Sequence, residues 1–382
     1  MKITAFETIP LKIPFSVGGP AGSRSTGWNT LEMVVLRLET DNGLVGWGDA
    51  FSYHCSASVQ AALDTMVKPL VMGREVSAIA PLMYELQQKL HLWGRYGITL
   101  FALSGLDIAL WDLAGKAAQQ PLCKLWGGAP KALPGYASLF FLGDPEIVAE
   151  HCRTALAQGY SHIKLHETGV REVHAAREVI GAAVPLMIDT NCPWTPGQAR
   201  EMALKFKPYD PYWLEEPIFP PEDYAALAAL QREVGIPLAA GENACTAFQF
   251  RDMFAAGAVK FAQPSVTKVG GITEFRKIVT LAETSAVTVM PHAPYFGPGF
   301  LATLQLMGAM THPGLVERFY LELEASLYGS LIDPVDGQFS IPDGPGLGCE
   351  PDPDVLRDYR AAWSSSPPAW IRTGNRCQQS AV

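Results

Sequence analysis

The chain has 382 residues, of which 48% are hydrophobic and 18% charged, so it exceeds one ordinary domain and is too apolar for global disorder. Its net charge of −9 and the lack of a basic run argue against nucleic-acid binding. The first residues resemble no signal peptide, no run of about 18 apolar residues suggests a membrane span, and seven scattered cysteines without a Cys-x-x-Cys pair predict a cytoplasmic protein with reduced thiols.

The first third of the chain predicts antiparallel strands followed by helices. Residues 3–7 alternate in polarity, and the apolar run 31–38 leads through Asp41-Asn42-Gly43, a hairpin turn, to a returning strand at 44–48. Helical segments are expected at about 57–72, 78–92 and 99–118. These elements together form an α+β unit. The loop of small residues at 18–26 is a candidate mobile lid.

From about residue 133, short apolar segments alternate with helical ones, which predicts the β/α repeats of a parallel barrel. A weaker eighth strand surrounds Leu315 and Val316. The segment from about 345 is expected to return to the first unit, and the Ser-, Pro- and Gln-rich end to be poorly ordered. The other seven candidate strands end at Leu139, Leu165, Ile188, Leu214, Ala240, Gln263 and Met290.

Three acidic residues recur at nearly equal intervals: Asp189, Glu215 and Glu242 are separated by 26 and 27 residues. This is the period of a β/α repeat, so each acid is expected at the C-terminal end of a successive strand, around one mouth of the barrel. Three carboxylates suit a hard divalent cation that keeps positions open for substrate, and Mg²⁺ is the first choice. The alternative is that these acids only cap helices.

Lys164 and His166 lie two residues apart on the strand before Asp189, so both side chains should point toward the same mouth. A lysine there can neutralise a substrate carboxylate. A histidine beside two cations should have a lowered pKa and accept a proton at pH 7. The alternative is that one of them is an ordinary polar residue at a strand end.

Further polar residues follow the later strands. His292 ends the seventh strand, about half a barrel from His166, and could face the other side of a bound substrate. Glu317, on the eighth strand, could donate a hydrogen bond to a developing oxyanion if protonated, or simply pair with Arg318. Lys268, before a Gly-Gly pair, is either structural or a substrate contact. The reaction that needs such a set is proton abstraction next to a carboxylate, with a cation and Lys164 stabilising the enediolate.

Two motifs resemble the enolase superfamily, in its mandelate racemase/muconate-lactonising branch, and the resemblance covers nearly the whole chain. Residues 102–116 (ALSGLDIALWDLAGK) resemble the helical motif of the capping domain, and the run 186–217, with Asp-x-Asn and Glu-Glu-Pro at its ends, resembles the metal-binding motif. The resemblance implies an α/β fold: an N-terminal α+β capping domain (1–128), a (β/α)7β modified TIM barrel (129–345) and a C-terminal segment (346–382) that returns to the capping domain. It also implies Mg²⁺ held by Asp189, Glu215 and Glu242, specificity loops near 18–26 and 51–54, and a homo-oligomer.

The chain departs from this family at two positions. His292 and Glu317 match the histidine and the acid of the mandelate racemase branch, but His166 stands where lysine is common. Ser265 stands where that branch has an aspartate that pairs with the histidine. A serine cannot ionise, although its hydroxyl can orient the ring. This disfavours racemisation by two matched bases.

The leading hypothesis is a Mg²⁺-dependent lyase acting on a small hydroxy-carboxylate, an acid sugar dehydratase. His166 takes the α-proton, Lys164 and Mg²⁺ hold the carboxylate, and His292 is the general acid at the β-hydroxyl. The alternatives are a racemase or epimerase that uses both histidines, and a non-catalytic carboxylate binder in which Ser265 marks decay of the acid–base apparatus. Further candidate substrate contacts, each equally credible as a packing or surface residue, are Arg24, Tyr53, His54, Asn191 and Tyr295, with Phe296 narrowing the pocket.

Overall fold

The computed structural model describes residues 1–17 and 28–361. The candidate lid at 18–26, with Arg24, and the end of the chain from 362 lie outside the described residues. Four strands form an antiparallel sheet in the order β12-β1-β2-β3, and the predicted turn between β2 and β3 is confirmed, with Gly43 at φ 82°. Its strands are β1 (Ile3–Ser16), β2 (Thr30–Thr40), β3 (Val45–Ala50) and the short β12 (Glu322–Leu323).

The three predicted helical segments of the first unit are present, and the first contains a π-helical turn. The longest helix, α4, is apolar enough to cross a membrane by length and composition, but 78% of its most apolar window is buried inside the protein. Burial of this kind is typical of a core helix. The helices are α1 (Ser56–Ala62), the π turn Leu63–Val67, α2 (Lys68–Val71), α3 (Ile79–Leu90) and α4 (Ile98–Ala117).

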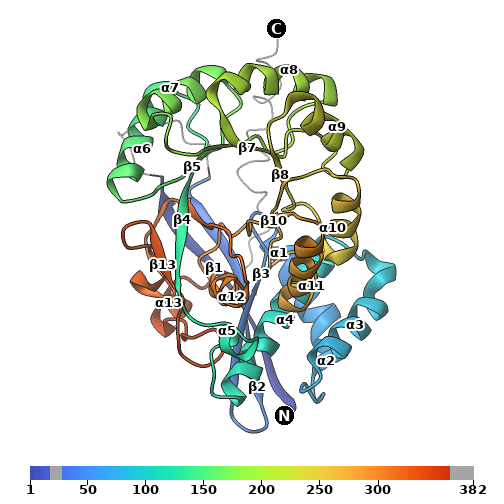
Figure 1. The fold of residues 1–382 in the computed structure, drawn as a ribbon. Helices are drawn as coiled ribbons and strands as arrows, with labels where there is room; N and C mark the ends of the chain where they lie inside the picture. Colours follow the sequence, from blue (N-terminus) through green and yellow to red (C-terminus); the bar gives the residue numbers. More distant parts are fainter. Residues whose placement is uncertain (18–27, 362–382) are drawn as a thin grey trace.

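The second sheet has nine strands, eight of them parallel in the order β10-β9-β8-β7-β6-β5-β4-β11, and the helices lie outside it (Figure 1). The predicted capped-barrel fold is thus confirmed. The parallel strands are β4 (Ala132–Leu139), β5 (Ile163–Leu165), β6 (Leu186–Asp189), β7 (Pro211–Glu215), β8 (Leu238–Ala240), β9 (Phe261–Ala262), β10 (Thr288–Val289) and β11 (Val316–Tyr320). The helices between them are α6 (Pro145–Ala157), α7 (Val170–Ile180), α8 (Pro196–Phe206), α9 (Tyr224–Val234), α10 (Thr246–Ala255), α11 (Gly271–Thr284) and α12 (Pro298–Ala309).

The weakly predicted eighth strand, β11, is a full member of the sheet. It pairs in parallel with β4 from Val316 opposite Gly135 to Tyr320 opposite Leu139. In the described part of the chain no ladder joins β11 to β10. That side of the barrel is held by other contacts: the Ala293 amide donates to Glu317 Oε2 at 2.9 Å, next to the mouth.

Alternation along the strands sorts the barrel interior into two layers. A buried apolar layer includes Tyr136, Met187 and Trp213, with Ala239, Phe261, Met290 and Leu315. Asp189 and Glu215 lie two residues beyond Met187 and Trp213 on β6 and β7, so their side chains point to the same side. They form the next layer, at the C-terminal ends of their strands. The remaining short elements are α5 (Leu122–Leu125), β13 (Gln338–Ser340), which pairs antiparallel with β4, and α13 (Pro353–Asp358).

The described C-terminal residues lie against the first strand. The Lys12 amide donates to Tyr359 O at 3.0 Å, and the Ala361 amide donates to Pro10 O at 2.8 Å. Domain boundaries at 128 and 345 stay a prediction.

Two buried carboxylates of the first unit cap helices of the barrel. Asp107 on α4 accepts a hydrogen bond from the Thr273 amide at 2.9 Å, in the first turn of α11, and Asp49 on β3 accepts one from the Gly299 amide in the first turn of α12. Amide groups at helix N-termini have no partner within the helix, so these carboxylates join the two units where the barrel helices begin.

Asp107 should make the stability of the folded protein depend on pH. Burial raises its pKa from 3.8 to about 7, although the hydrogen bonds from Thr273 oppose this. A raised folded-state pKa means that the folded protein binds the proton more tightly. The stabilising contribution is therefore present below pH 3.8 and is lost as pH rises through about 7. Asp107→Asn removes a slope of up to about 1.4 kcal/mol per pH unit in that window. Urea unfolding of both proteins between pH 5 and 8 measures it, and parallel pH profiles would contradict the assignment.

Candidate active site

Lys164 is the centre of the mouth of the barrel. Its fully buried Nζ lies 3.0 Å from Asp189 Oδ2, 3.0 Å from Glu215 Oε1 and 2.9 Å from Glu317 Oε1. Burial by itself lowers the pKa of the lysine, but these carboxylates raise it well above its ordinary value. Lys164 is therefore an ammonium ion held among carboxylates from three strands.

The three predicted acids come together. One oxygen from each of Asp189, Glu215 and Glu242 lies within 4.8 Å of the others, so the set could hold a metal ion. Glu242 follows β8 directly after Gly241, whose φ is 146° and where a Cβ would lie 2.8 Å from the Gln263 amide. Only glycine lets the chain pass β9 so closely and turn the acid into the mouth.

The charge balance of the mouth fits a divalent cation. Four acids converge there, Glu317 being the fourth, while Lys164 is the one lysine that the described structure pairs with them. Burial and the neighbouring Asp189 raise the pKa of Glu215 well above its ordinary value. Buried negative charge in excess of its partners is costly, and carboxylate oxygens are ligands that Mg²⁺ prefers. The residues present therefore suit such an ion.

His166 lies at the Asp189 end of the acid row, where the protein groups alone shift its pKa in the direction opposite to the one predicted beside a metal ion and Lys164. Its Nδ1 lies 2.5 Å from Leu139 O, and its Nε2 lies 3.2 Å from Asp189 Oδ2. Burial lowers the pKa of His166, but Asp189 outweighs it and the net pKa is raised. Lys164 also lowers the pKa of His166, but its effect is smaller than that of Asp189.

His292 occupies the opposite end of the row. Its Nε2 lies 2.8 Å from Glu242 Oε2, and its Nδ1 lies 2.8 Å from Ser265 Oγ. Burial raises the pKa of Glu242, but His292 lowers it more, to about 2, so Glu242 is ionised. The two histidines thus contact the first and the last of the three acids, which stand on neighbouring strands.

The pairing of Glu317 with Arg318 is wrong, because successive strand residues face opposite sides. Glu317 Oε1 accepts from Ser138 Oγ at 2.9 Å and Oε2 from the Ala293 amide. Burial raises its pKa, but Lys164 lowers it further, so the net pKa is lowered. Glu317 therefore accepts hydrogen bonds with both carboxylate oxygens, and its role as a donor to a developing oxyanion stays a prediction.

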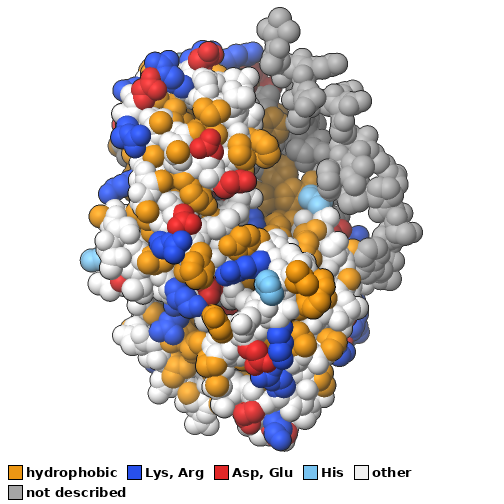
Figure 2. All heavy atoms as spheres, turned by 90° about the vertical axis from the view of Figure 1, so that its right-hand side faces the viewer, with side chains coloured by type: hydrophobic (Ala, Val, Ile, Leu, Met, Phe, Trp, Pro, Cys, Tyr) orange, Lys and Arg blue, Asp and Glu red, His pale blue; other side chains and the backbone are white. Residues whose placement is uncertain are grey.

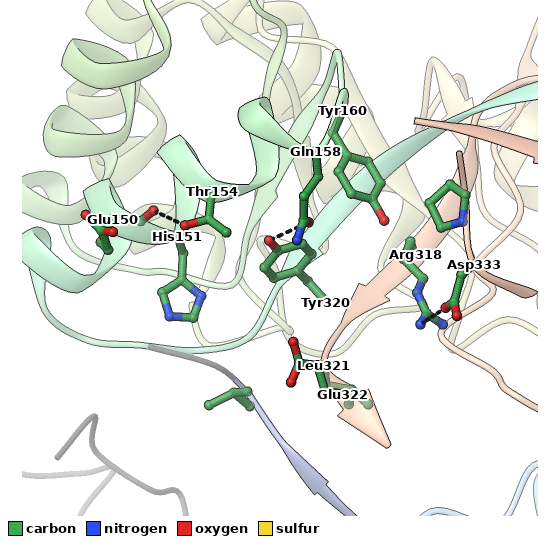
Figure 3. A pocket seen from close by; sticks show the side chains of 12 residues that line it. Glu150, His151, Thr154, Gln158, Tyr160, Arg318, Tyr320, Leu321, Glu322 and Asp333 are labelled. Carbon is green, nitrogen blue, oxygen red and sulfur yellow. Dashed lines mark hydrogen bonds and ion pairs between the residues drawn. The ribbon is translucent and has the colours of Figure 1, made fainter. Parts of the chain in front are cut away.

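Arg318 points into a separate pocket of about 740 Å³ outside the barrel, where it pairs with Asp333 at 2.6 Å (Figure 3). Tyr160 and Tyr320 also line this pocket. A second pocket, of about 640 Å³, lies between α3 and the pair α10 and α11, on the face shown in Figure 2, where hydrophobic and basic side chains adjoin. Neither pocket contains one of the three clustered acids.

Two candidate substrate contacts from the 51–54 loop lie in an aromatic wall over the mouth. The Trp28 ring is 5.6 Å from Tyr53, 5.0 Å from His54 and 6.0 Å from Phe319. Phe319 in turn lies 6.2 Å from His166. The Tyr53 hydroxyl donates to Pro294 O, so this tyrosine turns ring surface rather than a free hydroxyl toward its neighbours.

The other candidates are engaged in different ways. Lys268 is buried with its Nζ 4.6 Å from the Phe51 ring, a cation–π contact that supports the structural alternative. The Asn191 side chain is exposed, and only its backbone amide reaches Asp189 Oδ1, at 3.0 Å. Tyr295 is buried with its hydroxyl against Ser265 Oγ, and Phe296 lies 4.7 Å under the Arg318 guanidinium.

Sequence reasoning missed the residues that support the acids. Trp213 Nε1 donates to Glu215 Oε2 at 2.9 Å, and Asn243 Nδ2 donates to Glu216 Oε2 at 2.8 Å. Strand alternation could have identified Trp213, which lies two residues before Glu215 on the same face of β7. No local pattern marks Ser138 or Asn243, because their partners are distant in the sequence.

Comparisons with known proteins agree with this arrangement. The family descriptions "Mandelate racemase / muconate lactonizing enzyme, N-terminal domain" and "Enolase C-terminal domain-like" match residues 10–127 and 147–355. A 3,6-anhydro-alpha-L-galactonate cycloisomerase from Streptomyces coelicolor is 32% identical over 332 residues, covering 83% of this chain and 88% of that protein. An arabinonate dehydratase from Saccharolobus solfataricus is 29% identical, covering 86% and 91%. The crystal structure of a racemase from Streptomyces coelicolor with bound magnesium superposes with a TM-score of 0.83 at 30% identity, covering 94% and 100%.

Proposed function

Because the chain belongs to the mandelate racemase/muconate lactonizing enzyme family of the enolase superfamily, we propose that it is a Mg²⁺-dependent hydro-lyase that dehydrates a sugar acid. The observation that carries the proposal is the row of acids around Lys164 with a histidine at each end. Relatives that are named as dehydratases and cycloisomerases of sugar acids support the substrate class.

The proposed roles follow from the contacts of each group. Asp189, Glu215 and Glu242 would hold the cation, which supplies Lewis-acid stabilisation of a carboxylate that loses its α-proton. The ammonium of Lys164 would neutralise the same carboxylate. Leu139 O fixes Nδ1–H of His166, so Nε2 is the nitrogen left to accept the α-proton.

The elimination balances as follows. The Cα–H bond breaks and its proton moves to His166 Nε2, while the electron pair forms the enediolate. The C–O bond at the β-carbon then breaks, and His292 Nε2–H protonates the departing hydroxyl, which leaves as water. The remaining enol tautomerises to a 2-keto-3-deoxy acid. Glu317 would keep Lys164 in place, because its oxygens are occupied by Lys164, Ser138 and the Ala293 amide.

A screen with Mg²⁺ and a library of sugar acids tests the proposal. We expect a 2-keto-3-deoxy product from at least one acid, detected as its semicarbazone. No product across the library, with the cation site shown to be filled, would contradict a dehydratase.

An isomerase is the second candidate, because the two histidines stand at opposite ends of the site and relatives include cycloisomerases and a racemase. In D₂O an epimerase would incorporate deuterium at the α-carbon without loss of water, and a cycloisomerase would open or close a ring without a keto-deoxy product. A binder without catalysis would give thermal stabilisation by sugar acids and no exchange.

A further inference from the structure

The surroundings of Ser265 show how this chain supports His292 without the aspartate found at this position in the mandelate racemase branch. Ser265 Oγ lies 2.8 Å from His292 Nδ1, and 3.3 Å from the His292 carbonyl oxygen, to which it donates. It also contacts the hydroxyl of Tyr295, which itself lies 3.3 Å from His292 Nδ1. Ser265 is fully buried, and Tyr295 and His292 are nearly so.

One assignment of donors and acceptors satisfies every member of this group. A serine hydroxyl donates one hydrogen bond and accepts two. In this assignment Ser265 donates to the His292 carbonyl and accepts from His292 Nδ1–H and from the Tyr295 hydroxyl. Burial raises the pKa of Tyr295 well above its ordinary range, so the phenol keeps its proton and can donate it. Every hydrogen-bonding capacity of Ser265 is then used.

We propose that Tyr295 is a positioning residue, which, by donating to Ser265, aims a serine lone pair at Nδ1 and holds His292 with its exchangeable proton on Nε2. The inference rests on the proposed function for its consequence in turnover, but not for the geometry. Nε2 faces Glu242, on the side of the acids, at 2.8 Å. A ring fixed by Nδ1–H can release the Nε2 proton and remain hydrogen-bonded to Ser265.

The difference from an aspartate lies in charge. An aspartate accepts from Nδ1–H without help, because each of its oxygens has free lone pairs in any orientation. A serine hydroxyl rotates, and could equally donate to Nδ1 and favour the opposite tautomer. A donor in Tyr295 and an acceptor in the His292 carbonyl favour the orientation in which Ser265 accepts from Nδ1–H. Ser265 and Tyr295 together thus orient the His292 ring as an aspartate would, without adding a fifth negative charge to the mouth.

Replacing Tyr295 by phenylalanine tests the inference. In protein labelled with ¹⁵N-histidine, the His292 signals of the neutral ring, assigned with His292→Asn, should show the Nδ1–H tautomer. Tyr295→Phe and Ser265→Ala should each move a large part of the population to Nε2–H. Each substitution should lower kcat about 10- to 100-fold, near the lower end of the rate enhancement that a general acid contributes. KM should change less than threefold.

Further variants separate positioning from general damage. Tyr320→Phe removes a tyrosine hydroxyl that bonds Gln158 outside the barrel and should change neither signal nor kcat. Ser265→Asp introduced into Tyr295→Phe should restore the Nδ1–H tautomer, because the carboxylate needs no phenol. An unchanged tautomer in folded Tyr295→Phe would overturn the inference. The NMR result needs no turnover, so a failed substrate screen would leave the inference standing. An active enzyme with unchanged kcat in Tyr295→Phe would refute only the expected effect of this positioning on turnover.

Discussion

Lys164→Met is expected to abolish turnover and to destabilise the metal-free protein. The lysine contacts carboxylates from three strands, at 2.9 to 3.0 Å, and its removal leaves them buried without their cation. Breaking a buried ion pair from one side costs about 3–5 kcal/mol. Loss of a preorganised donor at a developing oxyanion costs about 10²–10³ in kcat, and more is expected here because the lost group carries a full charge.

Urea unfolding with and without Mg²⁺ measures the first effect, and kcat on the identified substrate the second. Added Mg²⁺ should recover part of the stability of Lys164→Met, because it replaces charge at the same carboxylates, but none of the turnover. Lys116→Met is the matched control: it breaks an ion pair with Asp112, 2.9 Å long and away from the mouth, so stability falls while kcat is kept. Retention of a tenth of wild-type kcat in Lys164→Met would contradict its role.

Glu215→Gln is expected to lower Mg²⁺ affinity at least 100-fold. Changes in residues that only support metal ligands cost about 10–100-fold in affinity, so loss of a direct carboxylate ligand should cost at least as much. The amide keeps the volume of the side chain and its contact with Trp213 Nε1, 2.9 Å away in the wild type. Isothermal titration of the metal-free proteins with Mg²⁺ measures the effect.

Two comparisons make this result specific. Glu216→Gln changes the neighbouring acid, which contacts Asn243 and is not one of the three clustered acids. Its loss of Mg²⁺ affinity should therefore be at least tenfold smaller than that of Glu215→Gln. Without Mg²⁺, Glu215→Gln should be no less stable than the wild type, because it removes one of several buried like charges. With Mg²⁺ the wild type should gain stability with the logarithm of free cation concentration, and the variant should gain less. Equal affinities for Glu215→Gln and the wild type would exclude Glu215 as a ligand.

The sequence predicted the barrel well where a period controlled the structure. The spacing of Asp189, Glu215 and Glu242 gave three successive strands, and alternation put Lys164 in the mouth. The eighth strand, β11, was underestimated because its predicted core was only Leu315 and Val316, whereas pairing with β4 extends it to Tyr320. Tertiary pairing here added what local hydrophobicity did not show.

Electrostatic details were predicted less well, since they depend on which charges meet. His166 was expected beside two cations, Mg²⁺ and Lys164, but the sequence did not show that its Nε2 also lies 3.2 Å from Asp189 Oδ2, which raises its pKa. The sequence also could not predict that Tyr295 is the partner of Ser265. The two residues are 30 positions apart, and no sequence pattern indicates that the Tyr295 hydroxyl lies near His292. Such contacts follow only from the closure of the barrel.

The aromatic wall over the mouth bears on substrate choice. The Trp28 ring lies 5.6 Å from Tyr53, 5.7 Å from Phe140 and 6.0 Å from Phe319. The Phe140 and Phe319 rings are stacked 5.6 Å apart, and Trp28 Nε1–H donates to the Thr30 carbonyl at 2.8 Å. Ring faces on this side suit the flat or cyclic part of an acid better than a row of hydroxyls. Within the substrate screen, compact cyclic acids and their open-chain counterparts therefore form an informative pair.

The central claim is that Asp189, Glu215 and Glu242 grip one divalent cation. Anomalous diffraction from crystals soaked in Mn²⁺, a scattering substitute for Mg²⁺, tests it most directly. We predict one strong peak per chain within bonding distance of an oxygen from each of these three side chains. A peak elsewhere, or three carboxylates that stay paired with Lys164, His166 and His292 while no ion binds between them, would contradict the account.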